Sequence, residues 1–128
     1  MSLMSVRVGT NDLPKAIEFY DAVLGTLGVA PNSAPAEYGI GMYKLANGPV
    51  FLVGGARDGN AATHANGGTV GFVAGSAEEV DAFHAAGLAQ GGTCEGEPGP
   101  RAQAGNAYGA YVRDRDGNKL CAYYGLGL

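Results

Sequence analysis

Two stretches of the chain share one pattern of apolar and polar positions. Residues 6–28 and residues 70–92 are separated by an offset of 64, which is half of the chain length of 128. In each stretch a segment that alternates between apolar and polar residues precedes a segment of helical periodicity. The matched positions include Val6 with Val70, Val8 with Phe72, Phe19 with Phe83, Leu24 with Leu88, and Gly28 with Gly92. A match at a fixed offset predicts two copies of one structural unit.

Each copy opens with a predicted strand and continues into a predicted helix. Residues 4–10 and 68–74 alternate, so that one face of each strand is apolar. Asp12 is placed to cap a helix over residues 13–27, with Pro14 in its first turn, where a missing N–H costs nothing. Ser76 and Glu79 have the spacing of a capping box and begin the second helix.

More strands follow each helix. Residues 37–45 and 50–53 flank the dipeptide Asn47-Gly48, which strongly favours a hairpin turn. Residues 108–113 and 119–124 flank a second turn over 114–118, and residues 93–95 are interpreted as a short strand. The segments 54–67 and 96–107 are rich in Gly, Ala and Pro and are expected to be loops. Each half is therefore predicted to be a βαβββ-like unit.

Composition and charge narrow the class of protein. The chain has 12 acidic and 8 basic residues, a net charge of −4, and 46% hydrophobic residues, which fits one compact domain over residues 1–128. Neither a basic cluster nor an apolar run of membrane-spanning length is present, so no nucleic-acid or membrane partner is expected. We see no signal-peptide pattern, and residues 1–3 resemble a cloning scar. Two isolated cysteines favour a reducing, cytoplasmic location.

Two segments carry a resemblance to a known family. The first has Asn11-Asp12-Leu13 after a strand, then Ile17-Glu18-Phe19-Tyr20 and Val23-Leu24-Gly25; the second runs from Tyr108 through Asp114-Arg115-Asp116-Gly117-Asn118 to Leu120. Together they resemble the vicinal oxygen chelate superfamily, which includes glyoxalase I, bleomycin-resistance proteins and extradiol dioxygenases. The resemblance implies an α+β fold of two βαβββ modules, about 4–57 and about 67–126, forming a cupped, half-barrel-like mixed sheet. It also implies a homodimer.

Metal-using members of that superfamily carry two His-like and two Glu-like ligands on symmetric strands. The resemblance maps these positions onto Ser5, Leu52, Thr69 and Cys121. Hydroxyl groups are poor metal donors, leucine has no donor atom, and a single thiol does not make a centre. We therefore expect no metal and no other cofactor at these positions, which argues against the metal-dependent activities of the family.

Strand alternation predicts the face that lies opposite the helices. A ligand groove between the modules would use this concave face, and the candidates for it are Ser5, Arg7, Tyr43, Leu52, Thr69, Tyr108, Lys119, Cys121 and Tyr123. Arg7, Lys119 and Arg101 are candidates for holding an anionic group of a ligand. Tyr43, Tyr108 and Tyr123 are candidates for stacking on a flat ligand, with ordinary aromatic packing as the alternative.

The two cysteines and two histidines of the sequence carry side chains that can react or bind a metal. Cys121 is a weak candidate nucleophile that Lys119 or Arg7 could activate, and the alternative is a buried thiol that fills space. Cys94 is interpreted as an inert structural thiol. His84 is expected to be a partly exposed helix residue, and His64 a solvated loop residue that could reach the rim of the groove.

The sequence lacks phosphate-binding and dinucleotide-binding glycine motifs, a nucleophile elbow and the H-E-x-x-H metal motif. The leading hypothesis is a metal-free relative of bleomycin-resistance proteins that binds a small organic molecule. The second hypothesis is a lyase or isomerase that resembles glyoxalases or dioxygenases, with a non-standard metal site or with Cys and Tyr chemistry. A third is a structural or interaction module derived from an enzyme.

Overall fold

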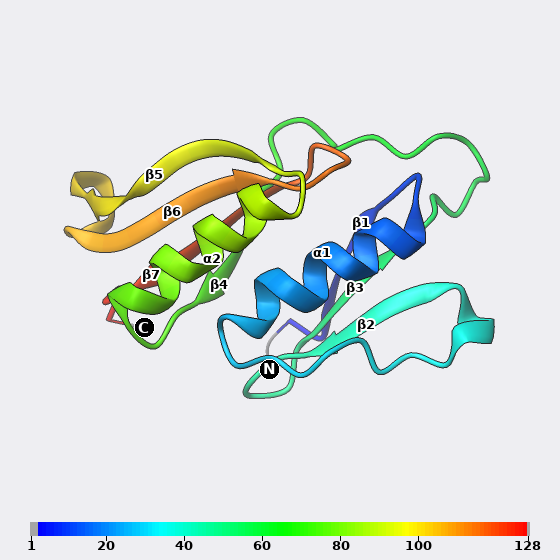
Figure 1. Ribbon diagram of the computed structural model, residues 1–128, viewed down its shortest axis with the longest axis horizontal. Helices are drawn as coiled ribbons and strands as arrows, with labels where there is room; N and C mark the ends of the chain where they lie inside the picture. Colours follow the sequence, from blue (N-terminus) through cyan, green and yellow to red (C-terminus); the bar gives the residue numbers. More distant parts are fainter. Residues whose placement is uncertain (1–2, 128) are drawn as a thin grey trace.

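Two mixed sheets, each with one helix packed on it, make up the computed structural model, which describes residues 3–127. The first sheet has the order β1 (Ser5–Gly9), β3 (Val50–Gly54), β2 (Ile40–Lys44). The second has the order β4 (Val70–Val73), β7 (Lys119–Tyr124), β6 (Ala107–Arg113), β5 (Thr93–Arg101). Helices α1 (Leu13–Gly25) and α2 (Ala77–Ala89) lie side by side in front of the strands in Figure 1. The sheets remain open, which agrees with the predicted α+β fold of cupped sheets.

The repeated unit of the sequence is visible in the strand pairing. β1 pairs with β3 in parallel, β4 pairs with β7 in parallel, and one helix follows the first strand of each pair. Asp12 caps α1 by accepting from the Lys15 N–H at 3.2 Å, and Ser76 caps α2 by accepting from the Glu79 N–H at 3.1 Å. Both predicted helix starts are therefore confirmed. The observed helix α1 ends two residues before the predicted helix over 13–27, because the chain forms turns from Thr26 onward.

The first module has one strand fewer than the predicted βαβββ unit, although each strand predicted there by residue range is present. Residues 29–35 follow α1 without strand structure, and β2 begins at Ile40 after a short 3-10 helix, Ala36–Tyr38. Pro31 and Pro35 have no N–H to donate to a ladder. The Asn32 side chain accepts from the Met42 N–H at 2.9 Å, in the place of a backbone carbonyl. The first sheet consequently has three strands and the second has four.

The prediction of a loop over residues 96–107 is wrong for its first half. β5 runs from Thr93 to Arg101 and is followed by a 3-10 helix, Ala102–Ala104. Register shifts between Cys94 and Gly96 and between Gly96 and Gly99 interrupt its pairing with β6. Such bulges let Gly and Pro stay in an edge strand, because unpaired residues need no ladder partner. The high Gly and Pro content of this segment therefore led to the prediction of a loop where the structure has a strand.

One hydrophobic core joins the two modules. It contains Phe19, Tyr20 and Phe51 from the first module and Phe72 and Phe83 from the second, and the rings of Phe51 and Phe72 lie 5.5 Å apart. The turn between β6 and β7 also crosses to the first module. There the Tyr20 hydroxyl donates to the buried Asp114 at 2.5 Å, and the Thr10 hydroxyl donates to Asp116 at 2.6 Å.

Candidate functional site

The strand faces that point away from the helices carry most of the predicted site residues. Val6, Val8, Phe51 and Val53 pack in the core, so their neighbours along β1 and β3 point to the opposite face. The same alternation in the second sheet places the core residues Phe72, Leu120 and Ala122 on the helix side. The outer faces consequently carry Ser5, Arg7 and Leu52 in the first module and Thr69, Gly71, Lys119, Cys121 and Tyr123 in the second.

Tyr43 and Tyr108 lie on the helix side, which corrects their predicted place in the groove. Tyr43 pairs with Phe51, is fully buried, and donates its hydroxyl hydrogen bond to Asp21 of α1 at 2.8 Å. The Tyr108 hydroxyl donates to Asp81 of α2 at 2.6 Å. Both tyrosines therefore hold helices on their sheets. Burial and the Asp21 carboxylate raise the pKa of Tyr43, and the hydrogen bond to Asp81 raises that of Tyr108.

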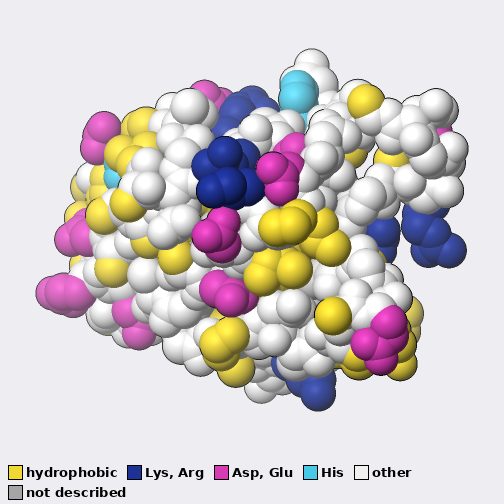
Figure 2. Space-filling view, turned by 45° about the vertical axis from the view of Figure 1, so that its right-hand side comes forward, with side chains coloured by type: hydrophobic (Ala, Val, Ile, Leu, Met, Phe, Trp, Pro, Cys, Tyr) yellow, Lys and Arg dark blue, Asp and Glu magenta, His cyan; other side chains and the backbone are white. Residues whose placement is uncertain are grey.

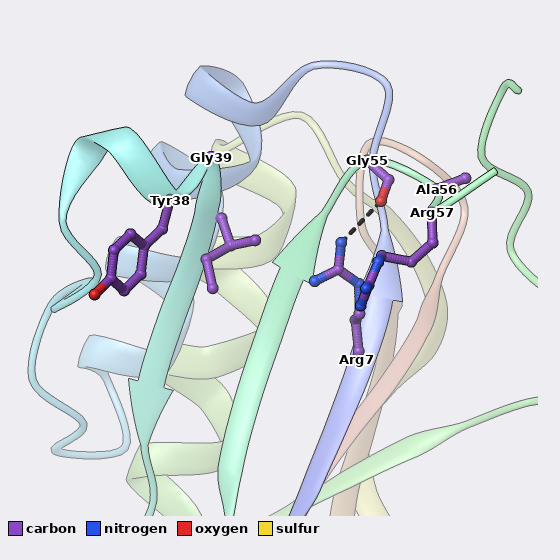
Figure 3. A pocket seen from close by; sticks show the side chains of 7 residues that line it. Arg7, Tyr38, Gly39, Gly55, Ala56 and Arg57 are labelled. Atoms are coloured by element: carbon purple, nitrogen blue, oxygen red, sulfur yellow. Dashed lines mark hydrogen bonds between the residues drawn. The ribbon is translucent and has the colours of Figure 1, made fainter. Parts of the chain in front are cut away.

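Within residues 3–127, one cavity lies on the outer face of each sheet. The first has a volume of about 550 Å³. The Arg7 guanidinium donates to the Gly55 carbonyl oxygen at 2.8 Å, which fixes the direction of this side chain. Figure 3 shows Arg7 and Arg57 reaching into one side of the cavity, with Tyr38 on the other side. Its lining residues are Arg7, Tyr38, Gly39, Ile40, Gly55, Ala56 and Arg57.

The second cavity, of about 440 Å³, belongs to the other module. Two cations lie near the Tyr111 ring, with the Arg101 guanidinium carbon 5.8 Å and the Lys119 Nζ 5.2 Å from its centroid. The single lining carboxylate, Glu95, forms an ion pair with Arg113 at 3.0 Å. The remaining positive charge favours an anionic ligand. The lining residues are Thr69, Glu95, Gly96, Arg101, Gln103, Tyr111 and Lys119.

Cys121 and Tyr123 lie beside the second cavity but are largely covered. They form a small buried cluster with Ala107, against which Tyr111 packs, and the hydroxyls of Tyr111 and Tyr123 are 2.7 Å apart. Burial raises the pKa of the Cys121 thiol, and the opposing effects of Tyr111 and Lys119 are smaller. A neutral thiol is a weak nucleophile. This position therefore has the properties of a buried residue that fills space.

Sequence reasoning missed several cavity residues. Tyr111 stands opposite Cys121 in the β6–β7 pairing, so the register of that hairpin was the signal that would have found it. Glu95, Gln103 and Arg57 lie in segments where loops or ends of strands were expected, and no periodic pattern predicts their direction. Arg101 was anticipated as an anion-holding residue, and it does line the second cavity.

The four positions mapped from the metal-using relatives do not make a metal centre by their chemistry. Ser5 and Thr69 offer neutral hydroxyls, Leu52 offers no donor, and the Cys121 thiol is buried. Within residues 3–127, one group of three His, Cys, Asp or Glu side chains could hold a metal, and it consists of His84, Cys94 and Glu97. None of the four mapped positions belongs to that group.

Of the other reactive residues, His84 differs from expectation, whereas the exposure of His64 agrees with it. His84 is 5% exposed, although a partly exposed helix residue was predicted. Cys94, which was interpreted as an inert structural thiol, is exposed, and its Sγ lies 3.2 Å from the His84 Nε2. His64 is exposed in the loop before β4 and sits against the β6–β7 turn, where a Cβ atom on Gly117 would lie 3.2 Å from its ring. It lines neither cavity.

These features define a class of protein, and comparison with known proteins gives the family. Paired modules of strand, helix and strands, with cavities on the sheet faces away from the helices, are the architecture that the sequence resemblance implied. The sequence-family model of the Glyoxalase/Bleomycin resistance protein/Dioxygenase superfamily matches residues 2–122 of this chain. The chain therefore belongs to this superfamily. Among proteins with curated functions, none matches the chain.

Solved structures of similar proteins agree with this family assignment. A glyoxalase/bleomycin resistance protein from Albidiferax ferrireducens T118 is 47% identical, with a TM-score of 0.88, and the match covers 96% of this chain and 98% of that one. A glyoxalase-related enzyme from Fulvimarina pelagi is 20% identical, with a TM-score of 0.76 and coverage of 98% and 88%. A lactoylglutathione lyase from Agrobacterium tumefaciens is also 20% identical, with a TM-score of 0.68 and coverage of 98% and 94%. The last two show a shared fold alone.

Proposed function

We propose that this protein binds a small organic anion at the outer faces of its sheets, without using a metal there. One observation carries the proposal: in a chain of net charge −4, each cavity gathers two basic side chains. They are Arg7 and Arg57 in the first cavity, and Arg101 and Lys119 in the second. Basic side chains gathered in a concave site attract anionic ligands and fix their orientation.

The chemistry of the second cavity suggests the ligand more closely. Tyr111 offers an aromatic face and a hydroxyl, and the two cations beside it can hold a carboxylate or another anionic group. Thr69 and Gln103 add neutral hydrogen-bonding groups to the lining. A ligand with a flat apolar body and one anionic group matches this set. Binding by charge and stacking needs no chemical step, so sequestration or carriage is the proposed activity.

An enzymatic function is the alternative for which the geometry gives less support. The Cys121 thiol is buried with a raised pKa, and the hydrogen bond between Tyr111 and Tyr123 raises the pKa of the Tyr111 hydroxyl. Neither group is therefore prepared to ionise near neutral pH. The lyase and the glyoxalase-related enzyme among the similar structures are each about 20% identical to this chain, and identity at that level does not carry an activity over to it.

We propose further that the protein is a cytoplasmic homodimer. Each cavity is lined by residues of one module only, so a surface from a second copy could complete either of them. Apolar side chains are exposed at the ends of strands, among them Met4 before β1, Val73 at the end of β4 and Tyr124 at the end of β7. Exposed apolar side chains at such ends favour association. The free cysteines fit a reducing compartment.

Other classes of partner are not part of the proposal. On the face in Figure 2, acidic side chains are scattered and basic ones stand in small separate groups, whereas a nucleic-acid surface needs a continuous basic patch. Within residues 3–127 no helix has both the length and the apolar character needed to cross a bilayer.

A paired ligand screen tests the proposed anion site. Small aromatic carboxylates and their neutral amides are compared by the shift that each produces in the melting temperature, and hits are titrated calorimetrically with and without a chelator. We expect saturable binding of carboxylates that persists with the chelator and weakens about tenfold or more in Lys119→Gln, because a charge-assisted hydrogen bond is lost.

Lys15→Gln is the matched control, because Lys15 lies on α1 and its side chain is 53% exposed. It should bind like the parent. Equal binding of acids and amides, or loss of binding with the chelator, would contradict the proposal. Turnover of a bound compound would favour the enzymatic alternative.

A further inference from the structure

Three side chains of different chemistry meet between α2 and β5, outside both cavities. The His84 Nε2 lies 3.2 Å from the Cys94 Sγ, and that sulfur lies 3.6 Å from a Glu97 carboxylate oxygen. All three ligand atoms lie within 4.8 Å of one another. We propose that His84, Cys94 and Glu97 form a binding site for a divalent transition-metal ion, with Zn²⁺ as the ion that fits best.

The two donor separations measured from the Cys94 sulfur agree with tetrahedral coordination. Zinc bonds are about 2.3 Å to a thiolate sulfur and about 2.0–2.1 Å to imidazole nitrogen or carboxylate oxygen, so tetrahedral angles put sulfur about 3.5 Å from the other donors. The observed separations of 3.2 Å and 3.6 Å need to change by only a few tenths of an ångström. Imidazole, thiolate and carboxylate together are a zinc-type donor set, whereas Mg²⁺ and Ca²⁺ prefer oxygen alone.

The bulge in β5 is what brings Cys94 and Glu97 together. In a regular strand, residues three apart point to opposite faces. Here Cys94 pairs with Val112 and Gly96 with Tyr111, so one extra β5 residue stands opposite β6. This shift turns the strand and lets Glu97 reach the sulfur of Cys94.

The site lies on the opposite face of β5 from the second cavity. Val112, the partner of Cys94, packs in the core on the side of α2. Glu95, the neighbour of Cys94, points the other way and bonds to Arg113 beside the cavity. The metal site is therefore separate from the proposed anion site, and neither depends on the other.

One of the three proposed ligands is buried and two are exposed, so the site combines a fixed ligand with access from solvent. His84 is 5% exposed, so the helix packing holds its ring in place. Cys94 and Glu97 are exposed, which gives an ion access from solvent. Three protein ligands leave the fourth tetrahedral position for water or for an exogenous ligand.

The test measures binding of Zn²⁺ and Co²⁺ to the tag-free, reduced full-length chain. We expect about one ion per chain, and for Co²⁺ the intense near-ultraviolet absorption of a cobalt–thiolate bond. Cys94→Ser should abolish that absorption, and Glu97→Gln should weaken binding about tenfold or more, since one of three ligands is lost. Both changes are at exposed positions, so the fold should be retained.

Cys121→Ser is the matched control, because it removes the other cysteine and leaves the cluster intact. It should bind the ions like the parent. A second measurement needs no substitution: Cys94 is the exposed thiol, so Zn²⁺ should slow its reaction with a thiol-specific reagent.

Several results would overturn the metal site. These are the lack of stoichiometric binding by the parent, cobalt binding without the thiolate absorption, and parental affinity in either Cys94→Ser or Glu97→Gln. Loss of binding in Cys121→Ser would move the metal to the outer sheet face, and would contradict the metal-free anion site as well. Failure of the ligand screen, by contrast, leaves this site unaffected.

Discussion

Asp114 is a buried carboxylate that organises the turn between β6 and β7. One of its oxygens accepts from the Asp116 and Asn118 N–H groups at 2.9 and 2.8 Å, and the other accepts from the Asn118 side chain and the Tyr20 hydroxyl. A buried carboxylate is stable only when its lone pairs are satisfied in this way. The Tyr20 hydroxyl is the contact that ties this turn to α1.

Removing the Tyr20 hydroxyl should lower the free energy of unfolding at neutral pH and change how that free energy depends on pH in the alkaline range. Tyr20→Phe is expected to lower the free energy of unfolding by about 1–2 kcal/mol, the usual effect of removing one partner from a buried hydrogen bond. Burial, followed by the charge of Asp114, raises the pKa of Tyr20 in the folded state. Above about pH 10 the unfolded tyrosine ionises while the folded one stays protonated, so stability falls as the pH rises.

Tyr20→Phe removes this contribution, so its deficit relative to the parent should shrink above about pH 10. Urea denaturation across that range measures both effects. Tyr38→Phe, a change at a side chain that is 65% exposed, should follow the parent curve. A deficit that stays constant with pH would contradict the linkage to Tyr20.

At the scale of elements, the junction between α2 and β5 depends on a residue without a side chain. The Gly92 N–H donates to the Gly87 carbonyl oxygen at 2.9 Å, which ends the helix and directs the chain into β5. A Cβ atom on Gly92 would contact the Arg113 carbonyl oxygen and would lie 2.8 Å from that of Gly87. Both obstacles are backbone atoms, so side-chain rotation cannot relieve them.

Gly92→Ala should therefore destabilise the protein by about 1–3 kcal/mol, the usual range for overpacking. Gly25→Ala, at the last residue of α1, is the control, because a Cβ there would have no neighbour within 4 Å. It should be neutral or stabilising by up to about 1 kcal/mol, since alanine favours helix. Thermal and urea denaturation compare the two variants, and equal stabilities would contradict the steric argument.

Strand alternation predicted the outer faces well where it was counted within one strand. Arg7, Thr69, Lys119, Cys121 and Tyr123 lie on the expected faces because a strand alternates regularly over a few residues. The alternation did not predict side-chain direction across a turn, because the result depends on the number of residues in the turn. Arg113 pairs with Lys119, so Tyr108 stands opposite Tyr124 on the helix side, whereas an even loop would have reversed its direction.

The contacts that were not predicted depend on pairings between distant segments. The capping residues act within a few positions of the sequence, and both helix starts were therefore predicted correctly. The meeting of His84 with Cys94 depends on how α2 packs on β5 and on a bulge that no periodic pattern indicates. The family resemblance supplied the architecture and strand alternation supplied Arg7 and Lys119, whereas Arg57 comes from a loop without a periodic pattern.

At the scale of the whole molecule, the two repeats form one folding unit. The aromatic core crosses from Phe51 to Phe72, and the turn of the second module bonds to Thr10 and Tyr20 of the first. The modules share one core, while their outer faces and several strand ends are open. The proposed homodimer would use those outer surfaces.

Light scattering coupled to size-exclusion chromatography tests the dimer. We expect a mass of about twice the 12.9 kDa of one chain. Val73→Asp should shift the equilibrium toward monomer, because Val73 is 75% exposed at the end of β4 and a charge there opposes burial. Leu88→Asp on α2, where the side chain is 41% exposed, is the control and should stay dimeric. A monomer at all concentrations would contradict the dimer.

The bulged pairing of β5 has a consequence for how this protein can diverge. From Cys94 to Gly99 the strand advances five positions while β6 advances three, from Val112 to Gly109. Gaining or losing one residue here exchanges which side chains face α2 and which face the cavity, while the ladder on either side is kept. Length variation in this strand can therefore redistribute chemistry between two surfaces without a single substitution, and homologues are best aligned here by face and not by residue count.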